Sequence, residues 1–552
     1  MNPEIPQKPR CADAIVQSLV DYGVDTVFGL PGAQTYGLFD ALHARRDAIK
    51  LYCSRHEQGA AYMAFGYAKS SGRTGVFTVV PGPGLLNASA ALVSAHSAPV
   101  LCLAGQVPST FAGLGHGMLH EISSQMDILR SMTKWSQRIE YAAETQSVMH
   151  EAFARLRTGR PQPVAVEVPA DVLDMQARVV EPRATPDVWR VEPDPMQIAR
   201  AVKLIRTARR PMIMVGSGAV EAGSEVLELA EILQAPVVSF RGGRGIVSDE
   251  LPYGLTCAEG YELWSTTDLL IGIGTRLELP AFRWQSGRPV QKLVRVDLDP
   301  RQMVRLRADA PIMADAKSAT RALIDELLRA HARPASRVQE FEEVKARTRR
   351  KIQSVQPQMA FLNAIRDVLP RDGFLVDELS QVGFASWYGF PTYLPRRLVT
   401  TGYQGNLGYG FQAALGVKIA NPQSSVVSIT GDGGFMFGVQ ELATAALHRI
   451  PVVIVLFNNR CFGNVRRDQN EMYGGRVYGA ELGNPDFLKL AESFGVAAHR
   501  AQDADQLRRL LEQALAAPGP VLIEVPCERG SESSPWPFIM PTGYGGARVS
   551  AD

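Results

Sequence analysis

Two segments in the C-terminal third of the sequence end apolar runs with residues that could bind a metal ion and phosphate. The run VVSITG leads into Asp432-Gly433-Gly434 and PVVIVLF leads into Asn458-Asn459, so that Asp432 and Asn459 lie 27 residues apart. Such unbroken apolar runs are typical of buried parallel strands, whose carboxyl ends meet at one edge of a sheet. Glycines there let N–H groups approach phosphate, and carboxylate and amide oxygens suit Mg²⁺. Each motif alone could be a turn or helix cap, but together they predict an anion and metal site.

A glutamate at another predicted strand end could act as an acid or a base. In IKLYCSRHEQGAAYMAFGYAKSSG, Glu57 follows a strand-like run and begins a helical segment that is rich in Ala and Gly. A glutamate in the first turn of a helix is commonly stabilised by the helix dipole alone, and this is the simpler alternative. A catalytic role for Glu57 therefore depends on the segments that surround it.

The two C-terminal motifs resemble the signature of thiamine-diphosphate-dependent enzymes, in which GDG is followed by NN. The segments RHEQGAAYMAFGYA, VVPGPGLLN, LAGQVPS and MTKW resemble the acetohydroxyacid (acetolactate) synthase group over nearly all of the N-terminal domain. TTGYQGNLGYGFQAALGVKIANP resembles the same group in the C-terminal domain. The resemblance implies thiamine diphosphate as cofactor, with Asp432, the Asn459 side chain and the Cys461 carbonyl holding Mg²⁺ on its diphosphate. It also implies that Glu57 activates the aminopyrimidine ring by sharing a proton with it.

Further residues fall on segments that bind the cofactor in that family. Leu407 corresponds to the hydrophobic residue beneath the thiazolium, and its neighbourhood to the aminopyrimidine contacts. Ser380-Gln381, after the strand-like GFLVDE, fall where the family has polar contacts to the diphosphate. The resemblance places the remaining cofactor contacts at Pro81, Asn87, Asn406, Gly431, Gly433, Gly434, Phe462, Gly463 and Asn464.

The candidate substrate residues depart from the family pattern. MLHE replaces the family's AFQE and makes His120 a candidate proton donor or acceptor, unless it is an ordinary surface or core histidine. Lys134 in MTKW fits the family pattern and is a further catalytic candidate. Asp468 stands where biosynthetic relatives carry a tryptophan, which predicts little preference for 2-ketobutyrate as acceptor. Arg466 and Arg467 could each bind a carboxylate through two hydrogen bonds, or could be solvated surface charges.

The middle of the sequence has a weaker nucleotide signal. RPMIMVGSGAV contains a GxG turn between a predicted strand and helix, without a third glycine at the Rossmann spacing. Four arginines, Arg241, Arg244, Arg276 and Arg283, could meet a pyrophosphate. The resemblance leaves FAD, a coenzyme A nucleotide and no ligand open at this place, and FAD would have a structural role.

The elements that must position these residues form an α/β pattern. Apolar runs alternate with helical patterns, which predicts three doubly wound parallel-sheet domains with the thiamine-diphosphate-binding fold, near 1–182, 190–335 and 355–552. Residues 179–195 are predicted to be a linker, and 333–358 a solvated linking helix. The predicted strands include TGVFTVV, APVLCLAG, PVAVEV, RPMIMVG, APVVSF, DLLIGIG, KLVRVDLD, SVVSITG, PVVIVLFNN and GPVLIEVP.

Composition excludes several classes of protein. The 552 residues have a net charge of +2, without a basic cluster that would indicate nucleic-acid binding. The six cysteines are scattered and form no CxxC pair, which favours reduced thiols in a cytoplasmic protein. No apolar run approaches the length of a membrane span, and the first residues lack the apolar segment of a signal peptide.

The leading functional prediction is a thiamine-diphosphate-dependent transferase of the acetolactate synthase type. It decarboxylates pyruvate or another 2-keto acid and adds the two-carbon unit to a second carbonyl, that of a keto acid, ketone or aldehyde. The alternative is a 2-keto acid decarboxylase, or a lyase that cleaves a 2-hydroxyacyl-CoA or a diketone. A nicotinamide oxidoreductase would leave Glu57 and both C-terminal motifs unexplained. The resemblance also implies a homodimer or homotetramer, because in the family each active site combines residues of two subunits.

Overall fold

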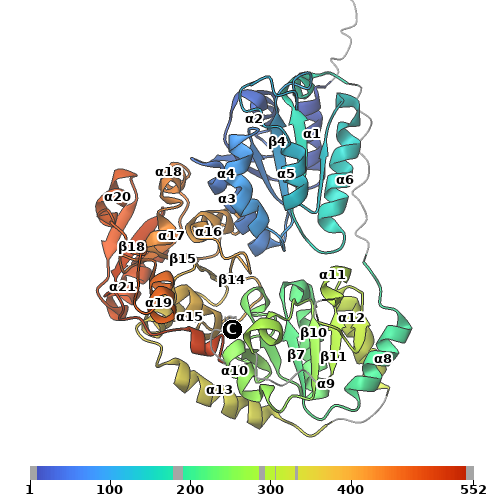
Figure 1. The fold of residues 1–552 in the computed structure, drawn as a ribbon, viewed down its shortest axis with the longest axis vertical. Coiled ribbons are helices and arrows are strands. Elements are labelled where there is room, and N and C mark those ends of the chain that lie inside the picture. Colours follow the sequence, from blue (N-terminus) through green and yellow to red (C-terminus); the bar gives the residue numbers. More distant parts are fainter. Residues whose placement is uncertain (1–8, 178–189, 285–291, 305, 330–333, 542–552) are drawn as a thin grey trace, which may run out of the picture.

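The computed structural model describes residues 9–177, 190–284, 292–304, 306–329 and 334–541. In this part of the chain the strands form three six-stranded sheets, one in each lobe of the molecule (Figure 1). Every strand pair within the sheets is parallel. The sheets lie one in each of the predicted domains, so the predicted fold class of three doubly wound parallel-sheet domains is confirmed.

The N-terminal sheet has the strand order β2-β1-β3-β4-β6-β5. Its strands are β1 (Thr26–Gly29), β2 (Lys50–Cys53), β3 (Gly75–Val79), β4 (Val100–Gln106), β5 (Trp135–Arg138) and β6 (Val164–Pro169). The helices are α1 (Cys11–Asp21), α2 (Tyr36–Ala44), α3 (Glu57–Ser71), α4 (Pro83–Ser94), α5 (Gln125–Met132), α6 (Thr145–Arg157) and α7 (Ala170–Asp174). The order reverses between β1 and β3, so the segments that follow these strands flank a crevice.

The central sheet has the order β12-β11-β10-β7-β8-β9, which read from the other edge is that of dinucleotide-binding domains. Its strands are β7 (Pro211–Val215), β8 (Val237–Ser239), β9 (Gly254–Thr256), β10 (Leu269–Ile273), β11 (Leu293–Val296) and β12 (Ala310–Ile312). The helices are α8 (Pro195–Ile205), α9 (Gly223–Leu233), α10 (Cys257–Trp264), α11 (Pro300–Met303) and α12 (Ala316–Leu328), and α13 (Val338–Ile352) links this domain to the next.

The C-terminal sheet, β14-β13-β15-β16-β18-β17, repeats the order of the N-terminal one. Its strands are β13 (Phe374–Val376), β14 (Leu398–Val399), β15 (Val426–Gly431), β16 (Val453–Asn458), β17 (Ala497–Arg500) and β18 (Val521–Pro526). The helices are α14 (Gln358–Val368), α15 (Gln381–Gly389), α16 (Tyr409–Ala420), α17 (Asp432–Phe435), α18 (Leu442–Leu447), α19 (Gly463–Met472), α20 (Phe487–Ser493) and α21 (Ala504–Leu515).

Helices α3 and α16 join the N-terminal and C-terminal domains through glycines. A Cβ atom at Gly66 would lie 2.0 Å from the Ala413 carbonyl oxygen, and one at Gly416 would lie 1.9 Å from the Met63 carbonyl oxygen. Only glycine permits this approach of the two backbones, which buries both helices on nearly all sides. Because α3 begins at Glu57 and α16 follows Leu407, this contact fixes two predicted site segments relative to each other.

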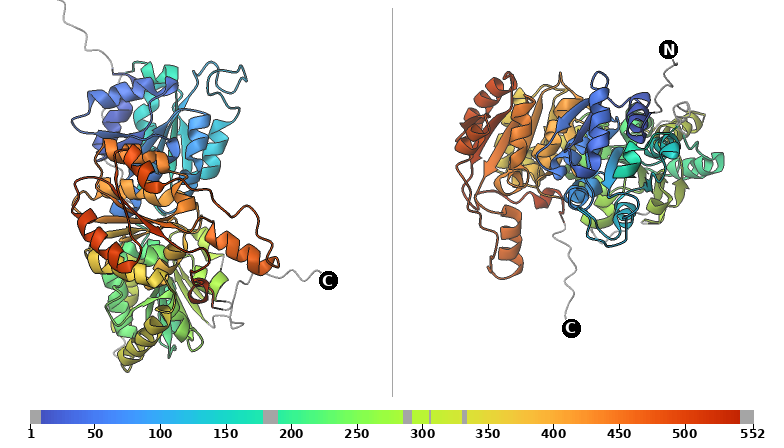
Figure 2. Two further views of the ribbon diagram at one scale, coloured as in Figure 1. Left: turned by 90° about the vertical axis from the view of Figure 1, so that its left-hand side faces the viewer. Right: turned by 90° about the horizontal axis from the view of Figure 1, so that it is seen from above.

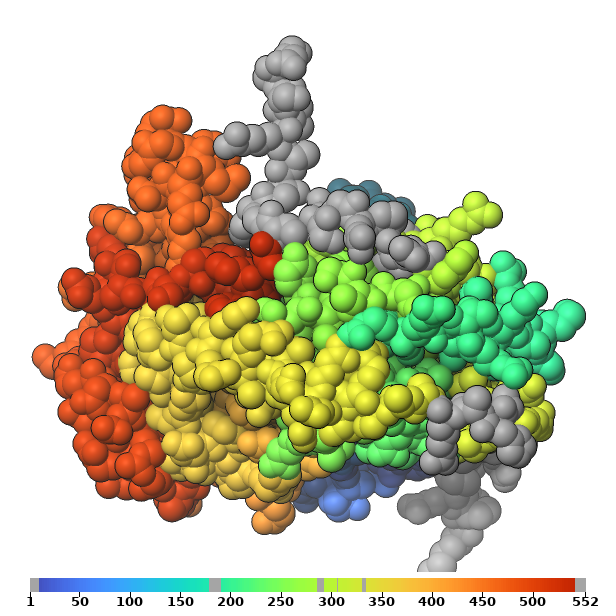
Figure 3. All heavy atoms as spheres, turned by 90° about the horizontal axis from the view of Figure 1, so that it is seen from below, coloured from blue at the N-terminus to red at the C-terminus, as the bar shows by residue number. Residues whose placement is uncertain are grey.

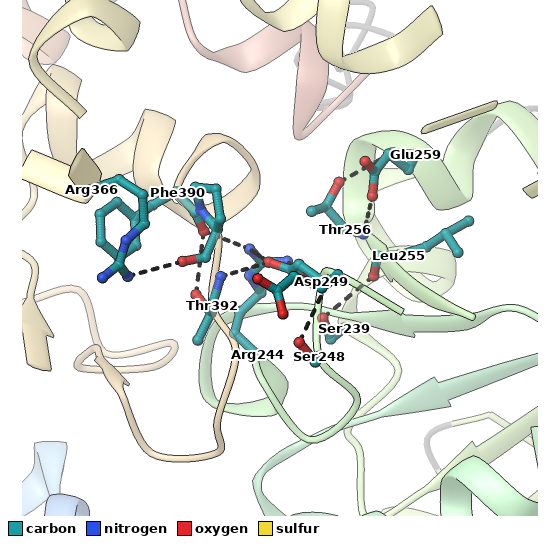
Figure 4. Close-up of polar contacts among 12 residues, drawn as sticks. Ser239, Arg244, Ser248, Asp249, Leu255, Thr256, Glu259, Arg366, Phe390 and Thr392 are labelled. Atoms are coloured by element: carbon teal, nitrogen blue, oxygen red, sulfur yellow. Dashed lines mark hydrogen bonds and ion pairs between the residues drawn. The ribbon is translucent and has the colours of Figure 1, made fainter. Parts of the chain in front are cut away.

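A buried ionic cluster joins the central and C-terminal domains (Figure 4). Arg244 is 2% exposed, and its Nη2 donates to Asp249 Oδ2 at 2.6 Å and to the Phe390 carbonyl at 2.7 Å. The Thr392 N–H donates to the same carboxylate at 2.7 Å. On the linking helix α13, Lys345 Nζ donates to the Asp249 carbonyl at 2.9 Å, so this predicted solvated helix has a buried face. The charges of Arg244 and Asp249 are thus matched by polar groups on both sides of the boundary.

Helix α19 projects from the body of the molecule, as the orange segment in Figures 2 and 3 shows. Its exposed large apolar side chains include Val465 and Met472, at 48% and 60%, and beyond the helix Tyr473 and Tyr478 are 56% and 91% exposed. Apolar surface of this kind is typical of a site of protein–protein contact. Among the residues that the structure describes, no helix has the length and apolar character needed to span a membrane.

Candidate active site

The predicted diphosphate-binding residues lie where the strand order of the C-terminal sheet reverses, between β13 and β15. Ligands of open α/β sheets bind in the crevice at such a reversal. A Cβ atom at Gly431, the last residue of β15, would lie 3.4 Å from Ser380 Cβ, in the segment that follows β13. The hydroxyl of Ser380 accepts the Gly383 N–H and caps α15. The structure therefore brings the predicted Ser380 and Gly431 side by side.

Asp432 begins α17 and is 2% exposed. Its Oδ2 accepts a hydrogen bond of 2.6 Å from Asn484 Nδ2, which also donates to Asn458 Oδ1 at 2.9 Å. Burial raises the pKa of Asp432, and the Asn484 bond and the Gly433 N–H oppose the rise. A divalent cation at this carboxylate would offset its desolvation, so the position fits the predicted Mg²⁺.

The side chain of Asn459 is held by hydrogen bonds to both ends of its amide. Its Oδ1 accepts the Cys461 N–H at 3.1 Å, and its Nδ2 donates to Glu532 Oε2 at 2.7 Å. Burial raises the pKa of Glu532; the Asn459 hydrogen bond and the charge of Arg467 oppose this rise, and the charge of Asp432 adds to it. Two acidic groups therefore lie near the predicted metal-binding amide, which is the electrostatic setting that a small divalent cation would relieve.

The glycines of this site permit close approach of neighbouring segments. A Cβ atom at Gly433 would lie 2.5 Å from the Phe462 ring, and one at Gly463 would lie 3.0 Å from Asn459 Nδ2. Gly463 is also the first residue of α19, so that the helix starts directly beside the predicted metal-binding amide. Phe462, Gly463 and Gly433 thus form one wall of the crevice together with Asn459.

Helix α19 carries polar residues to the same crevice. Arg467 Nη2 donates to Gln381 Oε1 at 2.8 Å, so Arg467 is paired with a predicted diphosphate contact. Asn464 Nδ2 donates to Asp468 Oδ2 at 3.1 Å, and Trp536 Nε1 donates to Asn464 Oδ1 at 2.7 Å. Burial raises the pKa of Asp468, whereas the charge of Arg467 lowers it. The carboxyl group of Asp468 is therefore hydrogen-bonded directly to Asn464, a predicted cofactor contact.

The segment before α16 packs between two parts of the chain. Asn406 Nδ2 donates to the Ala90 carbonyl at 2.8 Å and to Ser94 Oγ at 2.7 Å, both on α4. Gly408 has a φ of 83°, and a Cβ atom there would lie 2.4 Å from Phe437 Cβ. Leu407, between these two anchored residues, is half-buried. The main chain around Leu407 is therefore fixed against both the N-terminal domain and the segment that follows residues 431–434.

Glu57 and Asn87 are in direct contact. Asn87 Nδ2 donates to Glu57 Oε2 at 3.0 Å, and a Cβ atom at Gly84 would lie 3.4 Å from Glu57 Oε1. Glu441, a fully buried residue of the C-terminal domain, accepts the His56 N–H at 3.0 Å. The start of α3 is thus held from both domains, which leaves the Glu57 carboxylate with a defined position.

His120 lies beside the turn that leads to α4. It has a φ of 70°, and its Nδ1 lies 2.8 Å from Gln34 Oε1. A Cβ atom at Gly82 would lie 2.4 Å from the His120 carbonyl oxygen, and Pro81 Cδ lies 3.2 Å from the position of a Cβ at Gly105. The structure therefore brings His120 and Pro81 to the strand-order reversal of the N-terminal sheet, the edge at which Glu57 follows β2.

Lys134 lies elsewhere, and this placement contradicts the catalytic role predicted for it. It precedes β5 and so stands at the amino edge of the parallel sheet, opposite the carboxyl edge that carries Glu57. Its Nζ donates to the carbonyl oxygens of Arg155, Thr158 and Arg160, at 2.9, 2.5 and 3.0 Å. All three ammonium protons are therefore used to hold the chain at the end of α6.

A cavity of about 480 Å³ lies where the three domains meet. It is centred on the reversal between β7 and β10, where a Cβ atom at Gly216 would lie 2.6 Å from the Gly274 carbonyl oxygen. Burial, together with neighbouring positive charges that include Arg160, lowers the pKa of Lys69 to about 8 and that of His96 to about 3. An anionic ligand would relieve this excess of positive charge, so the cavity fits a nucleotide diphosphate.

Two of the four arginines predicted to meet a pyrophosphate are in other places. Arg276 and Arg241 line the cavity, and the Arg276 guanidinium stacks 3.7 Å from the centre of the Tyr403 ring. Arg244 is instead the buried partner of Asp249, and Arg283 pairs with Glu278 at 2.6 Å. Arg241 also pairs with Glu278, at 3.3 Å, so spacing in the sequence did not distinguish the arginines that line the cavity from those that do not.

Sequence reasoning missed several polar residues that organise the site. Asn484 and Glu532 hold Asp432 and Asn459 but lie in aperiodic segments, where residue type gave no signal. Glu441 caps the start of α3 from 384 residues further along the chain. Glu378 is the last residue of the strand-like segment GFLVDE, and its position just beyond the carboxyl end of a buried strand was a usable signal.

Fold and site together define an α/β enzyme with polar half-sites on two domains and a nucleotide-type cavity where the third, central domain meets them. Residues 9–128, 198–323 and 380–525 match the N-terminal TPP-binding, central and C-terminal TPP-binding domains of thiamine pyrophosphate enzymes. The chain belongs to the thiamine pyrophosphate enzyme family.

Curated relatives match over nearly the whole length. The chain is 33% identical to a probable acetolactate synthase large subunit of Methanocaldococcus jannaschii, over 93% of this chain and 91% of that protein. It is 34% identical to a probable 2-ketoarginine decarboxylase of Pseudomonas aeruginosa, over 95% of each chain. It is 32% identical to an acetolactate synthase large subunit of Haemophilus influenzae, over 92% of each chain.

Proposed function

We propose that this protein is a thiamine-diphosphate- and Mg²⁺-dependent carboligase of the acetolactate synthase type. The observation that carries the proposal is the gathering of Asp432, Asn459 and the 431–434 segment at one strand-order reversal, in a chain whose relatives include acetolactate synthases. Pyruvate or another 2-keto acid would be the donor, and the acceptor a second keto acid, ketone or aldehyde.

Each predicted site residue would have a specific role in binding the cofactor or in proton transfer. Asp432, Asn459 and the Cys461 carbonyl would hold Mg²⁺, and Ser380, Gln381 and residues 431–434 would hold the diphosphate. When bound, thiamine diphosphate supplies a nucleophilic carbon and an electron sink for decarboxylation. Glu57 would hold a proton at the aminopyrimidine ring nitrogen, kept in place by Asn87. His120 would donate or accept a proton near the substrate, and Leu407 would support the thiazolium ring.

The experiment that tests this proposal has two stages. Mass analysis of denatured purified protein identifies any bound thiamine diphosphate, flavin or coenzyme A. Incubation with pyruvate alone, with Mg²⁺ and thiamine diphosphate, then distinguishes the products: acetolactate supports the carboligase, whereas acetaldehyde alone supports a decarboxylase. Absence of both products, with no binding of thiamine diphosphate, would contradict the proposal.

A 2-keto acid decarboxylase is the second candidate, and two observations favour it. One relative is a probable 2-ketoarginine decarboxylase, and Asp468 brings a carboxyl group beside Asn464 in the predicted site. A carboxylate there would attract a keto acid with a cationic side chain and repel one whose carboxylate approaches as acceptor. Release of CO₂ from 2-ketoarginine at a higher kcat/KM than from pyruvate would establish this activity.

Substitution of Asp468 tests the acceptor prediction directly. We expect the unmodified enzyme to show little preference for 2-ketobutyrate over pyruvate as acceptor, and Asp468→Trp to shift the ratio toward 2-ketobutyrate. A packing contact of this size is worth about 1–3 kcal/mol, or roughly 10- to 200-fold in selectivity. The measurement is the product ratio with both keto acids present, and Asp468→Asn is the control that removes charge without adding bulk. An unchanged ratio in Asp468→Trp contradicts the assignment.

We also propose a homodimer or homotetramer with active sites between subunits. Exposed apolar residues beside the predicted cofactor segments support it, namely Phe437 at 50% and Met436 at 40%, together with those on α19. Mixing dissociated Glu57→Gln and Asp432→Ala chains should restore activity, because half of the sites in a mixed dimer then combine two native residues. Sites within single chains would give no restoration, and reassociation of either variant with itself is the control.

The cavity at the central domain would bind the diphosphate of a nucleotide cofactor. The two candidate cofactors are FAD and a coenzyme A nucleotide. The cationic lining and the dinucleotide-type strand order support this. A flavin absorbance band in the purified protein would identify FAD, whose role here would be structural. We propose a cytoplasmic location, which the free thiols of all six cysteines support.

A further inference from the structure

Two adjacent acidic residues follow β13, and they face different surroundings. Asp377 Oδ2 accepts the Trp387 indole N–H at 2.6 Å, within the C-terminal domain. Glu378 is 1% exposed, and its carboxylate lies against segments of the predicted cofactor site. No part of the proposed mechanism uses Glu378.

The carboxylate of Glu378 contacts three separate segments. Its Oε2 accepts the Gly410 N–H at 3.0 Å, at the start of α16 just after Leu407. Its Oε1 accepts the Leu379 N–H at 3.3 Å, next to the diphosphate candidates Ser380 and Gln381. A Cβ atom at Gly434 would lie 3.0 Å from Glu378 Cδ. The segments at 379–381, 407–410 and 431–434 therefore meet at this one carboxylate.

We propose that Glu378 is a positioning residue for the cofactor, holding the thiazolium-supporting segment and the two diphosphate-binding segments in register. This inference rests on the proposed function, because it presupposes that these three segments bind thiamine diphosphate.

Both carboxylate oxygens of Glu378 must act as hydrogen-bond acceptors in this arrangement. Burial raises the pKa of Glu378 to about 7, and the N–H groups of Gly410, Leu379 and Gly408 oppose that rise. A glutamine of the same shape would keep one acceptor but turn an NH₂ group toward one of these N–H donors. The resulting donor–donor contact can be relieved only by moving one segment away from the others.

The test compares Glu378→Gln with Asp377→Asn. The control replaces the neighbouring buried acid, whose amide oxygen can still accept the Trp387 bond and which contacts none of the three segments through its side chain. We expect Glu378→Gln to raise the apparent Kd for thiamine diphosphate, measured with saturating Mg²⁺, by about 10- to 100-fold, the scale of losing a hydrogen bond to a charged group. The Tm of the cofactor-free protein should stay within a few degrees of wild type.

Each outcome decides between the alternatives. Equal Kd values for Glu378→Gln and wild type overturn the inference and leave the proposed function intact. A raised Kd in Glu378→Gln also overturns the inference if the Tm of the cofactor-free variant falls by more than a few degrees below wild type. Glu378 would then serve the overall stability of the protein. A wild type that does not bind thiamine diphosphate removes the proposed function together with this inference.

Discussion

Replacement of Glu57 by glutamine is expected to lower turnover by about 10²- to 10⁴-fold while the cofactor and Mg²⁺ still bind. The amide has nearly the same shape and can still accept the Asn87 bond of 3.0 Å, but it cannot hold and release a proton at the ring nitrogen. The cofactor would therefore remain in place without being activated. The start of α3 should also be preserved, because Glu441 accepts the His56 N–H independently of the Glu57 side chain.

The measurement combines single-turnover product formation with the amount of thiamine diphosphate retained after gel filtration. Glu151→Gln is the matched control, since Glu151 lies on α6 and pairs with Arg155 at 2.6 Å, away from the site. Turnover near the wild-type rate would remove Glu57 from the mechanism. Loss of cofactor together with turnover would assign Glu57 to binding instead of activation.

Asp432→Ala is expected to weaken retention of Mg²⁺ and thiamine diphosphate by more than about 100-fold. Residues that only orient a metal ligand typically cost 10–100-fold in affinity when replaced, and Asp432 is the one charged group in the predicted ligand set. The substitution also leaves the Asn484 amide without its 2.6 Å acceptor, which adds to the loss.

Dialysed protein is assayed for bound cofactor and metal, and activity is then titrated with both. Excess Mg²⁺ and thiamine diphosphate should restore part of the activity of Asp432→Ala, and a chelator should inactivate the wild type reversibly. Asp372→Ala, an exposed position before β13, is the control. Equal cofactor retention in mutant and wild type after dialysis would show that the metal assignment is wrong.

The strands that the sequence predicted and those that it missed differ in their place in the sheet. Interior strands such as β4, β10 and β16 are continuous apolar runs because helices cover both faces. The strands without a clear apolar run are mainly at sheet edges, among them β5 (WSQR), β14 (LV) and β17 (AAHR). β5 and β17 are partly exposed and β14 has only two residues, so hydrophobic patterning does not mark these strands.

The residues of the candidate site also fall into those that the sequence could predict and those that it could not. Residues next to strand ends, such as Asp432, Asn459 and Glu57, could be predicted because the carboxyl edge of a parallel sheet brings them together. Lys134 was misassigned because its motif says nothing about which end of the strand it occupies. Glu441 and Asn484 could not be predicted, since their roles arise from contacts between segments far apart in the sequence.

The buried cluster of Arg244 and Asp249 makes the central domain a poor candidate for removal. A shortened enzyme that kept only the N-terminal and C-terminal lobes would take the Arg244 donor from the Phe390 carbonyl and the Asp249 acceptor from the Thr392 N–H. It would also take Tyr253 from the ring of Phe341 on α13, whose centroid lies 5.9 Å away, and leave this buried apolar side chain facing solvent. Attempts to build a minimal version of this catalyst, or to exchange its central lobe for that of a relative, therefore need to transplant the cluster with the lobe.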